Sequence, residues 1–423
     1  MAVVPSSGLS PGGASAYDRW QTMVQSTKQG MPSGAKPIEP HVTRLQGRNL
    51  VFGAGDSLKL SMPQLDADII DLTPADPLNM DDRASWQLNI RGAEVMLTDG
   101  QITTFLRAQL GDSAKAVQNL QIRFLPDNKL EVTGKATKLH IGFTVKADIR
   151  LDDKKRMALV PTSIKFGILS LLPLAKTFNL NIEKLAKFSD KQGRFGITGN
   201  NFWIDPAHLS DSPKIVGTVS QVRSQQGFLS IYMGKADAVH PLWLPHAGNY
   251  ATLTGGHLIT GGQIIKNPEI LLRDKTANDP FNMDDEPGRT TTVVHGEVTL
   301  PQAKLNAIID SAVGDGDTFQ VKKFSMTEKG AKINGTLKGF LPVEIYLRFA
   351  RSKDGMLKIE PHGGKLSFIP IPGGLLRSII GGMLKGSTKE GDGFVVGPDM
   401  LGSTQLGQLI SVTNTNGALE LKI

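Results

Sequence analysis

Few residues of this chain have the types and spacing that catalysis requires. Gly8-Leu9-Ser10-Pro11-Gly12 matches the Gly-x-Ser-x-Gly pattern, but no strand pattern precedes it and no helix pattern follows, so we interpret it as a chance match. Gly363-Gly364-Lys365 lacks the glycine spacing and the following Ser or Thr of a phosphate-binding loop. His240 and His246 lie six residues apart in a proline-rich stretch, and we do not interpret them as metal ligands. The sequence predicts a protein that is not an enzyme and that needs no cofactor.

One group of oxygen-bearing side chains deserves comparison with a calcium site. Asp76, Asn79, Asp81 and Asp82 could offer oxygen ligands to Ca²⁺. Their spacing is not that of an EF-hand, and Pro, Asn and Asp favour turns for separate steric and hydrogen-bonding reasons. We therefore expect Asp81 and Asp82 to cap a turn, with a Ca²⁺ site as the alternative and no metal as the prediction.

The same stretch recurs 203 residues later (284 − 81), which indicates an internal repeat. Residues 76–82 and 279–285 differ only by Leu78 and Phe281. Shorter matches follow in the same order while the offset falls to 190 residues, as small deletions in a second copy would produce. The alternative is coincidence among turn residues. The pattern predicts a flexible arm at 1–42 with a short amphipathic helix, a first unit at 43–233, a linker at 234–251 and a second unit at 252–423.

Composition and charge narrow the class of protein. The chain has no Cys, which excludes disulfides, thiolate metal sites and a cysteine nucleophile, and its 46 Gly and 24 Pro suggest turn-rich β structure. Residues 113–187 carry 14 Lys or Arg against 6 Asp or Glu, and residues 316–389 carry 13 against 5. An anionic membrane surface is a candidate partner, a solvated outer face is the alternative, and nucleic acid is not expected because no aromatic-interleaved basic motif occurs.

Hydrophobic periodicity predicts long strands and short helices in each copy. From 139 to 151 every odd residue is apolar, and 341–349 repeats the pattern, so each strand should bury one face. Strands are also expected at 46–72, 86–97, 118–125 and 129–137, with closing strands at 214–233 and 406–423. Helices are expected from Thr98 to Leu110 and from Pro301 to Val313, each stopped by Gly. After Pro161 and Pro361 each copy has an apolar segment that starts strand-like, breaks at Pro and continues with helical spacing.

The two copies contain a series of short motifs: Ile122 to Arg150 with Leu130-Glu131-Val132-Thr133-Gly134, Leu159-Val160-Pro161, Phe202…Pro206…Leu209, Gly227-Phe228-Leu229-Ser230-Ile231, Lys332-Ile333-Asn334-Gly335, Ile359-Glu360-Pro361, Phe394…Pro398…Leu401 and Asn416-Gly417-Ala418-Leu419. Two tandem units are similar to the arrangement of bactericidal permeability-increasing-type proteins. With these motifs, the order of elements resembles the LmeA-like phospholipid-binding family of bacteria, within the tubular lipid-binding (TULIP) superfamily. The resemblance implies an α+β fold in which each long twisted antiparallel sheet wraps around an apolar helix and leaves a tube for acyl chains.

The function expected from this resemblance is binding, and as a second option transfer, of phospholipid or another long apolar ligand. The alternative is a non-enzymatic structural or assembly protein built on the duplicated fold with filled grooves, and a protein is a further candidate partner. No run of 18 apolar residues and no secretory signal pattern occurs, so we expect a cytoplasmic or membrane-surface location, with the bacterial cell envelope as the alternative. The expected lipid-binding residues are Ile102, Phe105, Leu106, Phe143, Val145, Phe166, Leu169, Leu172, Leu174, Phe178, Leu305, Ile308, Ile309, Ile345, Leu347, Phe368, Leu376, Ile379 and Ile380.

Overall fold

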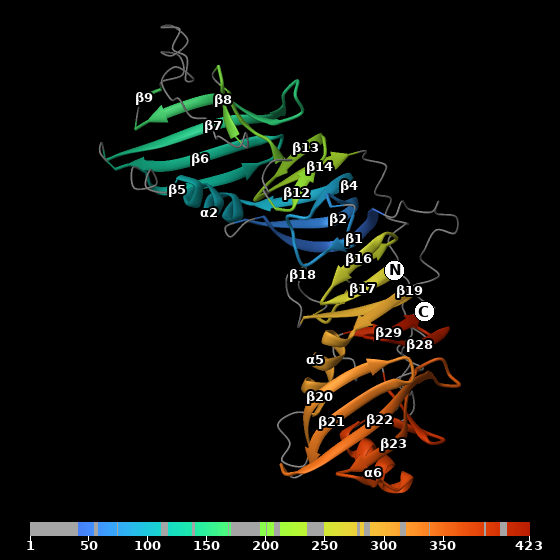
Figure 1. Cartoon of the computed structure of the whole chain (residues 1–423). Helices are drawn as coiled ribbons and strands as arrows, with labels where there is room; N and C mark the ends of the chain where they lie inside the picture. Colours follow the sequence, from blue (N-terminus) through green and yellow to red (C-terminus); the bar gives the residue numbers. More distant parts are fainter. Residues whose placement is uncertain are drawn as a thin grey trace, which may run out of the picture. The chain divides into compact units, whose positions relative to one another are not determined.

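The computed structural model (Figure 1) describes residues 41–54, 58–73, 75–110, 117–137, 140–167, 169–170, 195–199, 201–206, 212–234, 249–276, 280–282, 288–313, 319–337, 339–384, 386–397 and 404–423. Its contacts divide the chain into two units. The N-terminal unit comprises Pro37–Gly256 and Leu272–Arg289, and the C-terminal unit contains His257–Leu271 and Thr290–Ile423.

The N-terminal unit is built from two sheets. The strands of its first sheet lie in the order β13 (Val219–Gln225), β14 (Phe228–Gly234), β4 (Trp86–Thr98), β2 (Leu58–Asp71), β1 (Val42–Ala54) and β15 (Tyr250–Thr254), with β12 (Lys214–Val216) parallel to β4 and β18 (Phe281–Asn282) parallel to β1. The strands of its second sheet lie in the order β10 (Phe195–Thr198), β11 (Asn201–Ile204), β8 (Met157–Phe166), β7 (Ile141–Leu151), β6 (Lys129–Ala136) and β5 (Val117–Leu125), with β9 (Leu169–Ser170) on β8. The helix α2 (Asp99–Leu110) contacts both sheets, and β3 is a two-residue strand (Leu78–Asn79).

The C-terminal unit has the same kind of second sheet. Its strands lie in the order β25 (Thr388–Glu390), β26 (Gly393–Val395), β23 (Leu357–Leu366), β22 (Leu341–Arg351), β21 (Gly330–Leu337) and β20 (Phe319–Thr327), with β24 (Ile369–Pro370) on β23. Its first sheet contains β17 (Gln263–Asp274), β19 (Arg289–Pro301), β29 (Ala418–Lys422) and β28 (Ser411–Thr415), with β16 (His257–Thr260) on β17 and β27 (Thr404–Leu406) parallel to β19. The helices are α5 (Gln302–Val313) and α6 (Gly373–Met383).

Both second sheets carry a bulge immediately after a proline. In one, Ala147 pairs with Pro161 but Lys146 pairs with Ser163, and in the other Leu347 pairs with Pro361 but Tyr346 pairs with Gly363. One residue is therefore extra in β8 and one in β23. A proline has no backbone N–H for the ladder, so it is tolerated at such an irregularity.

A three-way hydrogen-bonded junction joins the two sheets at the start of α2. The Asp99 amide donates to the Gly227 carbonyl (3.1 Å), the Gly227 amide donates to the Phe124 carbonyl (3.1 Å), and the Phe124 amide donates to Asp99 Oδ1 (2.7 Å). Thr98 and Gln101 add a capping box, because the Thr98 amide donates to Gln101 Oε1 (2.8 Å) and the Gln101 amide donates to Thr98 Oγ1 (3.3 Å).

The start of α5 repeats this junction. Gln302 takes the place of Asp99: its amide donates to the Gly417 carbonyl (2.8 Å), and its Oε1 accepts from the Met326 amide (3.0 Å). The Gly417 amide closes the triangle by donating to the Met326 carbonyl (3.3 Å). The duplication itself stays a prediction, which superposition of the two units with Pro161 over Pro361 would test; Asp284 lies outside the described residues.

Most of the predicted elements are confirmed. The helices run from Asp99 to Leu110 and from Gln302 to Val313, and β7 and β22 are the two long alternating strands. Residues 214–233 and 406–423 differ from the prediction, because each forms a hairpin preceded by a separate short strand or turn. The side chain of Asp82 caps the turn at residues 79–85 as expected, since the Ala84 amide donates to Asp82 Oδ1 (3.0 Å). Asp81 contributes its backbone amide instead, which donates to Asn79 Oδ1 (3.1 Å).

The predicted α+β class is wrong. The structure is mostly β, with large antiparallel sheets and three short helices in the described part of the chain, and no sheet wraps around an apolar helix there. The second apolar segment shows the reason: after Pro370 and Pro372, α6 runs for only 11 residues, and these include the pairs Gly373-Gly374 and Gly381-Gly382, which disfavour helix. It spans about 16 Å at 1.5 Å per residue, about half the length of the strand β23 on which it packs. Of the first apolar segment, Ile164 to Ile182, the strand-like beginning lies in β8 and β9, and the residues from Leu171 onward lie outside the described residues.

We expect the junction side chains to contribute to stability. Asp99→Ala leaves the buried Phe124 amide without its acceptor and should lower the free energy of unfolding by about 1–3 kcal/mol, measured by urea denaturation. Asp99→Asn keeps an acceptor oxygen and should cost clearly less. Equal losses in the two variants would contradict a role for the hydrogen bond.

Candidate functional site

The strongest candidate site is an apolar surface on β7 and β8. Phe143 pairs with Phe166 and Val145 pairs with Ile164, so the four side chains lie on one face of the second sheet. The two phenyl rings are 5.8 Å apart between centroids and tilted by 34°. Gly134 lies opposite Phe143 in β6, and a Cβ atom there would lie 2.6 Å from the Phe143 ring, so the glycine makes room for that ring.

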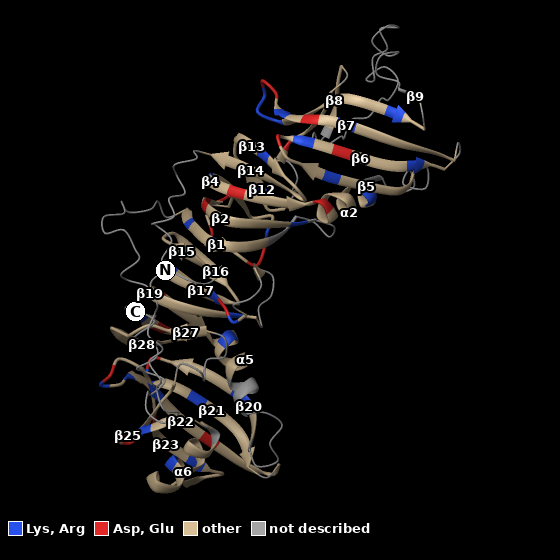
Figure 2. Cartoon of the chain, turned by 180° about the vertical axis from the view of Figure 1, so that it is seen from behind, with Lys and Arg blue, Asp and Glu red and all other residues tan. Residues whose placement is uncertain are grey.

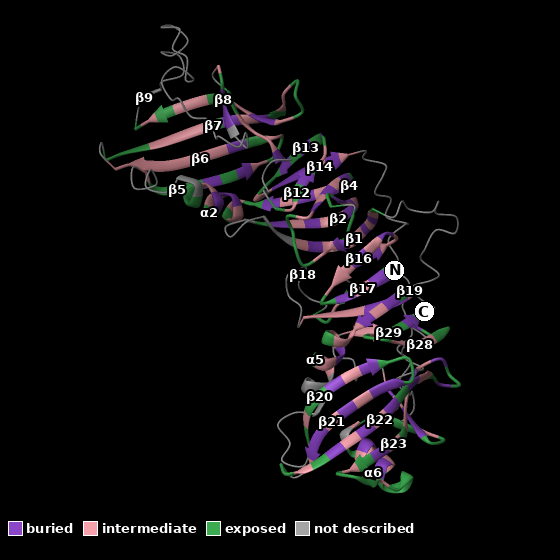
Figure 3. Cartoon of the chain, viewed as in Figure 1, coloured by how far each residue is buried: buried purple, intermediate pink, exposed green. Residues whose placement is uncertain are grey.

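Among the residues that the structure describes, one end of this face is covered and the other end is open. Ala147 and Ile149 are buried where β13 packs against β7. Farther along β7, Val145 and Phe143 are only half-buried, and Ile141 is exposed. We call the five side chains Ile141, Phe143, Val145, Ile164 and Phe166 the open face; all five consist of hydrocarbon only, and Figure 3 shows their strands largely in pink and green toward that end.

The corresponding face of the C-terminal unit is filled by α6. Ile345 is 0% exposed, and Leu376 and Ile380 of the helix are buried as well. A Cβ atom at Gly364, opposite Ile345, would lie 3.2 Å from Leu376 Cδ1, so the glycine lets the helix approach the sheet. The register places Ile164 at the equivalent position of β8, opposite Val145.

A second contact of α6 shows the same difference between the units. A Cβ atom at Gly381 would lie 2.9 Å from the ring of Phe394, which is 8% exposed and pairs with Ile359 in the sheet. Phe202 pairs with Leu159 in the same way in the N-terminal unit but is 37% exposed. The apolar face is therefore complete in one unit and only partly covered in the other, within the residues that are described.

Charged side chains lie on the opposite face of the second sheets. Glu344 accepts from the Tyr346 hydroxyl (2.8 Å) and from Lys332 Nζ (3.0 Å), and these hydrogen bonds, that of Tyr346 first, lower the pKa of Glu344. In the N-terminal unit Lys146 lies 3.5 Å from Glu131. Paired charges on the solvent side confirm the predicted alternation and leave the other face to hydrocarbon side chains.

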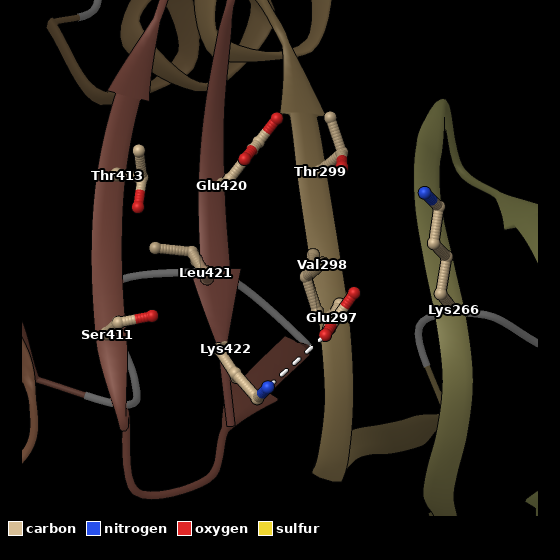
Figure 4. A pocket seen from close by; sticks show the side chains of 9 residues that line it. All are labelled: Lys266, Glu297, Val298, Thr299, Ser411, Thr413, Glu420, Leu421 and Lys422. Carbon is tan, nitrogen blue, oxygen red and sulfur yellow. Dashed lines mark ion pairs between the residues drawn. The ribbon is translucent and has the colours of Figure 1, made fainter.

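A polar depression in the first sheet of the C-terminal unit is a second, weaker candidate. It has a volume of about 220 Å³ and is lined by side chains that include Lys266, Glu297, Glu420 and Lys422. Figure 4 shows Lys422 paired with Glu297, at 3.4 Å between Nζ and Oε1, and both side chains are exposed. Exposed ion pairs of this kind contribute little free energy and are screened by salt, so the depression is a poor candidate for a binding site.

The residues predicted to bind lipid are dispersed over both units. Phe143, Val145 and Phe166 belong to the open face, and Leu169 of β9 is exposed close to it, through the pairing of Leu169 with Phe166. Leu172, Leu174 and Phe178 lie outside the described residues, as does the side chain of Ile309. The rest are placed as follows: Ile102, Phe105, Leu305, Ile345, Leu347, Leu376 and Ile380 are buried, Leu106, Ile308 and Ile379 are half-buried, and Phe368 is exposed.

Sequence reasoning missed three residues of this region. Ile141 and Ile164 continue the alternation of their strands, so the same period-two pattern could have included them. Phe202 could have been found from its match with Phe394 at offset 192.

Comparisons with known proteins do not assign a family. No protein-family model matches the chain, and no curated protein matches it. A solved structure titled "Crystal structure of lipopolysaccharide binding protein" is similar to the chain with 9% identity and a TM-score of 0.16, covering 91% of this chain and 98% of that one. At this TM-score the similarity carries no argument. None of the helices in the described ranges is long and apolar enough to cross a membrane.

The contrast between the two faces predicts a difference in stability effects. Ile345→Ala removes a fully buried side chain beneath α6 and should lower the free energy of unfolding by about 2–5 kcal/mol. Ile164→Ala makes the same chemical change on the open face and should cost clearly less, because its side chain is already partly in water. Thermal and urea unfolding of both variants measure this, and a larger loss for Ile164→Ala would contradict an open face.

Proposed function

We propose that the chain binds a long apolar ligand, such as the acyl chain of a phospholipid, on the open face of the N-terminal unit. The ligand would lie across β7 and β8 and remove Ile141, Phe143, Val145, Ile164 and Phe166 from water. The function is binding without catalysis, because the five side chains of the face are hydrocarbon and carry no reactive group. Transfer of the ligand is a further step of the same proposal.

The observation that carries the proposal is the partial exposure of five neighbouring apolar side chains on one sheet face. Contiguous apolar surface of this kind marks sites for ligands, proteins or membranes in soluble proteins. Each half-buried aliphatic or aromatic side chain gains free energy when the rest of its surface leaves water, at roughly 25 cal/mol per Å². A flexible hydrocarbon chain suits such a face because it needs no hydrogen-bonding partner.

A second function is favoured by the contacts of the C-terminal unit. There the equivalent face is occupied by Leu376 and Ile380, and Gly364 and Gly381 allow the close approach of α6. We propose that this unit has a structural role at that face and that the ligand is bound by the N-terminal unit. The lipid contacts predicted for Leu376 and Ile380 are not part of this proposal.

The test begins with the purified full-length chain. Native mass spectrometry without added lipid should show a bound acyl-containing ligand, and a fluorescent long-chain fatty acid should bind in a saturable manner. Ile164→Asn places an unpaired amide on the open face and should weaken binding of the fatty acid about tenfold or more.

Lys146→Gln is the matched control, because this residue lies between the open-face residues of β7 but points to the opposite side. It should bind the fatty acid as tightly as the unmodified chain. The absence of both a copurified ligand and saturable binding would sink the proposal. Equal affinity of Ile164→Asn and the unmodified chain for the fatty acid would show that the ligand does not bind at β8.

A further inference from the structure

A group of large apolar side chains is exposed at one end of the C-terminal second sheet. Phe340, in the turn between β21 and β22, is 71% exposed, and Phe368, in the turn after β23, is 86% exposed. Ile369 and Leu375, which follow in β24 and the first turn of α6, are also exposed. We call these four residues the apolar tip; Figure 3 shows this end of the unit and α6 in green.

Backbone pairing brings the two turns together. The first residues of β22 pair with the last residues of β23, with Val343 opposite Leu366. The Ser367 amide then donates to the Pro342 carbonyl (2.7 Å), which joins the two turns directly. Ser367 has a φ of +57°, a left-handed conformation that is uncommon for a residue with a side chain. The two phenylalanines therefore extend from adjacent turns that are hydrogen-bonded to each other.

The outer surface of α6 continues this apolar end. Leu376 and Ile380 face the sheet and are buried, whereas Leu375 is exposed and Ile379 is half-buried on the other side. Arg377 is the one charged residue in the 11-residue helix, and it pairs with Asp392. A helix that is apolar on both sides is normally covered on both. Within the described part of the unit the outer side of α6 has no apolar cover at Leu375.

The segment that forms most of the tip carries basic charge only, while acidic side chains from outside it lie beside two of its residues, Glu344 opposite Lys365 and Asp392 at Arg377. Residues 361–389 contain four Lys or Arg (Lys365, Arg377, Lys385 and Lys389) and no Asp or Glu. Lys365, beside the Phe368 turn, is exposed, and Figure 2 shows blue segments close to α6. Bulky apolar side chains with basic neighbours suit the boundary of an anionic bilayer, where hydrocarbon enters the acyl region and the ammonium groups stay at the phosphates.

We propose that the apolar tip inserts into the surface of an anionic phospholipid bilayer. Phe340, Phe368, Ile369 and Leu375 enter the boundary between headgroups and acyl chains, and Lys365 contacts lipid phosphates. This contact is separate from the open face, because it uses other residues, in the other unit, and binds an assembled membrane rather than a single apolar molecule.

Vesicle flotation with the full-length chain tests the proposal. The chain should bind vesicles of phosphatidylcholine with phosphatidylglycerol more strongly than vesicles of phosphatidylcholine alone, and added salt should weaken binding. Phe340→Ser and Phe368→Ser should each reduce partitioning about tenfold or more. Ile410→Ser is the matched control, because Ile410 is 62% exposed in the same unit but lies before β28, outside the tip.

The absence of Cys from the chain allows a direct measurement of insertion. Phe368→Cys labelled with an environment-sensitive fluorophore should shift to shorter wavelength on adding anionic vesicles, and labelled Ile410→Cys should not. No shift at position 368, or unchanged flotation of Phe340→Ser and Phe368→Ser, would overturn the proposal. Self-association without lipid that is lost in Phe368→Ser, measured by sedimentation velocity, would also overturn it and assign the tip to a second copy of the chain.

Discussion

The apolar face of each long hairpin is the constraint on which the structure depends. An antiparallel strand with alternating side chains places all its large apolar groups on one side, and that side must leave water. In the C-terminal unit α6 satisfies the requirement, with Ile345 fully buried beneath it. In the N-terminal unit the face at Phe143 and Val145 stays partly exposed in the described residues. The two units thus meet the same requirement to different degrees.

Local patterns in the sequence were sufficient to predict most elements. The alternation in 139–151 and 341–349 and the stop signals at Gly111 and Gly314 depend on neighbouring residues only, so strands and helices were placed within a few residues. The predicted fold class was wrong because the helix content was overestimated. In the apolar run after Pro361, two prolines precede the helix and two glycine pairs lie within it, and the helix is only 11 residues long.

The site was less predictable because burial depends on distant residues. Phe166 and Leu376 are both apolar residues that follow a proline in the sequence. Phe166 is half-buried on a sheet, whereas Leu376 is buried on the inner side of α6. The difference lies at one position of each second sheet, Gly364 in β23 and Ile164 in β8. The glycine lets a helix approach, and the register between strands shows that the two positions are equivalent. Likewise, the helix expected from Thr98 gives no sign that the carboxylate of Asp99 accepts a hydrogen bond from the amide of Phe124, 25 residues away.

The junction at the start of α2 has a consequence for how the N-terminal unit opens. Chain positions 99, 124 and 227 meet there through three hydrogen bonds, although the strands β6 to β11 of the second sheet lie between Phe124 and Gly227 in sequence. The end of β5 is therefore bound both to the start of α2 and to the turn between β13 and β14 of the first sheet. Native-state hydrogen exchange of the Phe124 and Gly227 amides would then follow a single opening event, in which β5 separates from the start of α2 and from the first sheet.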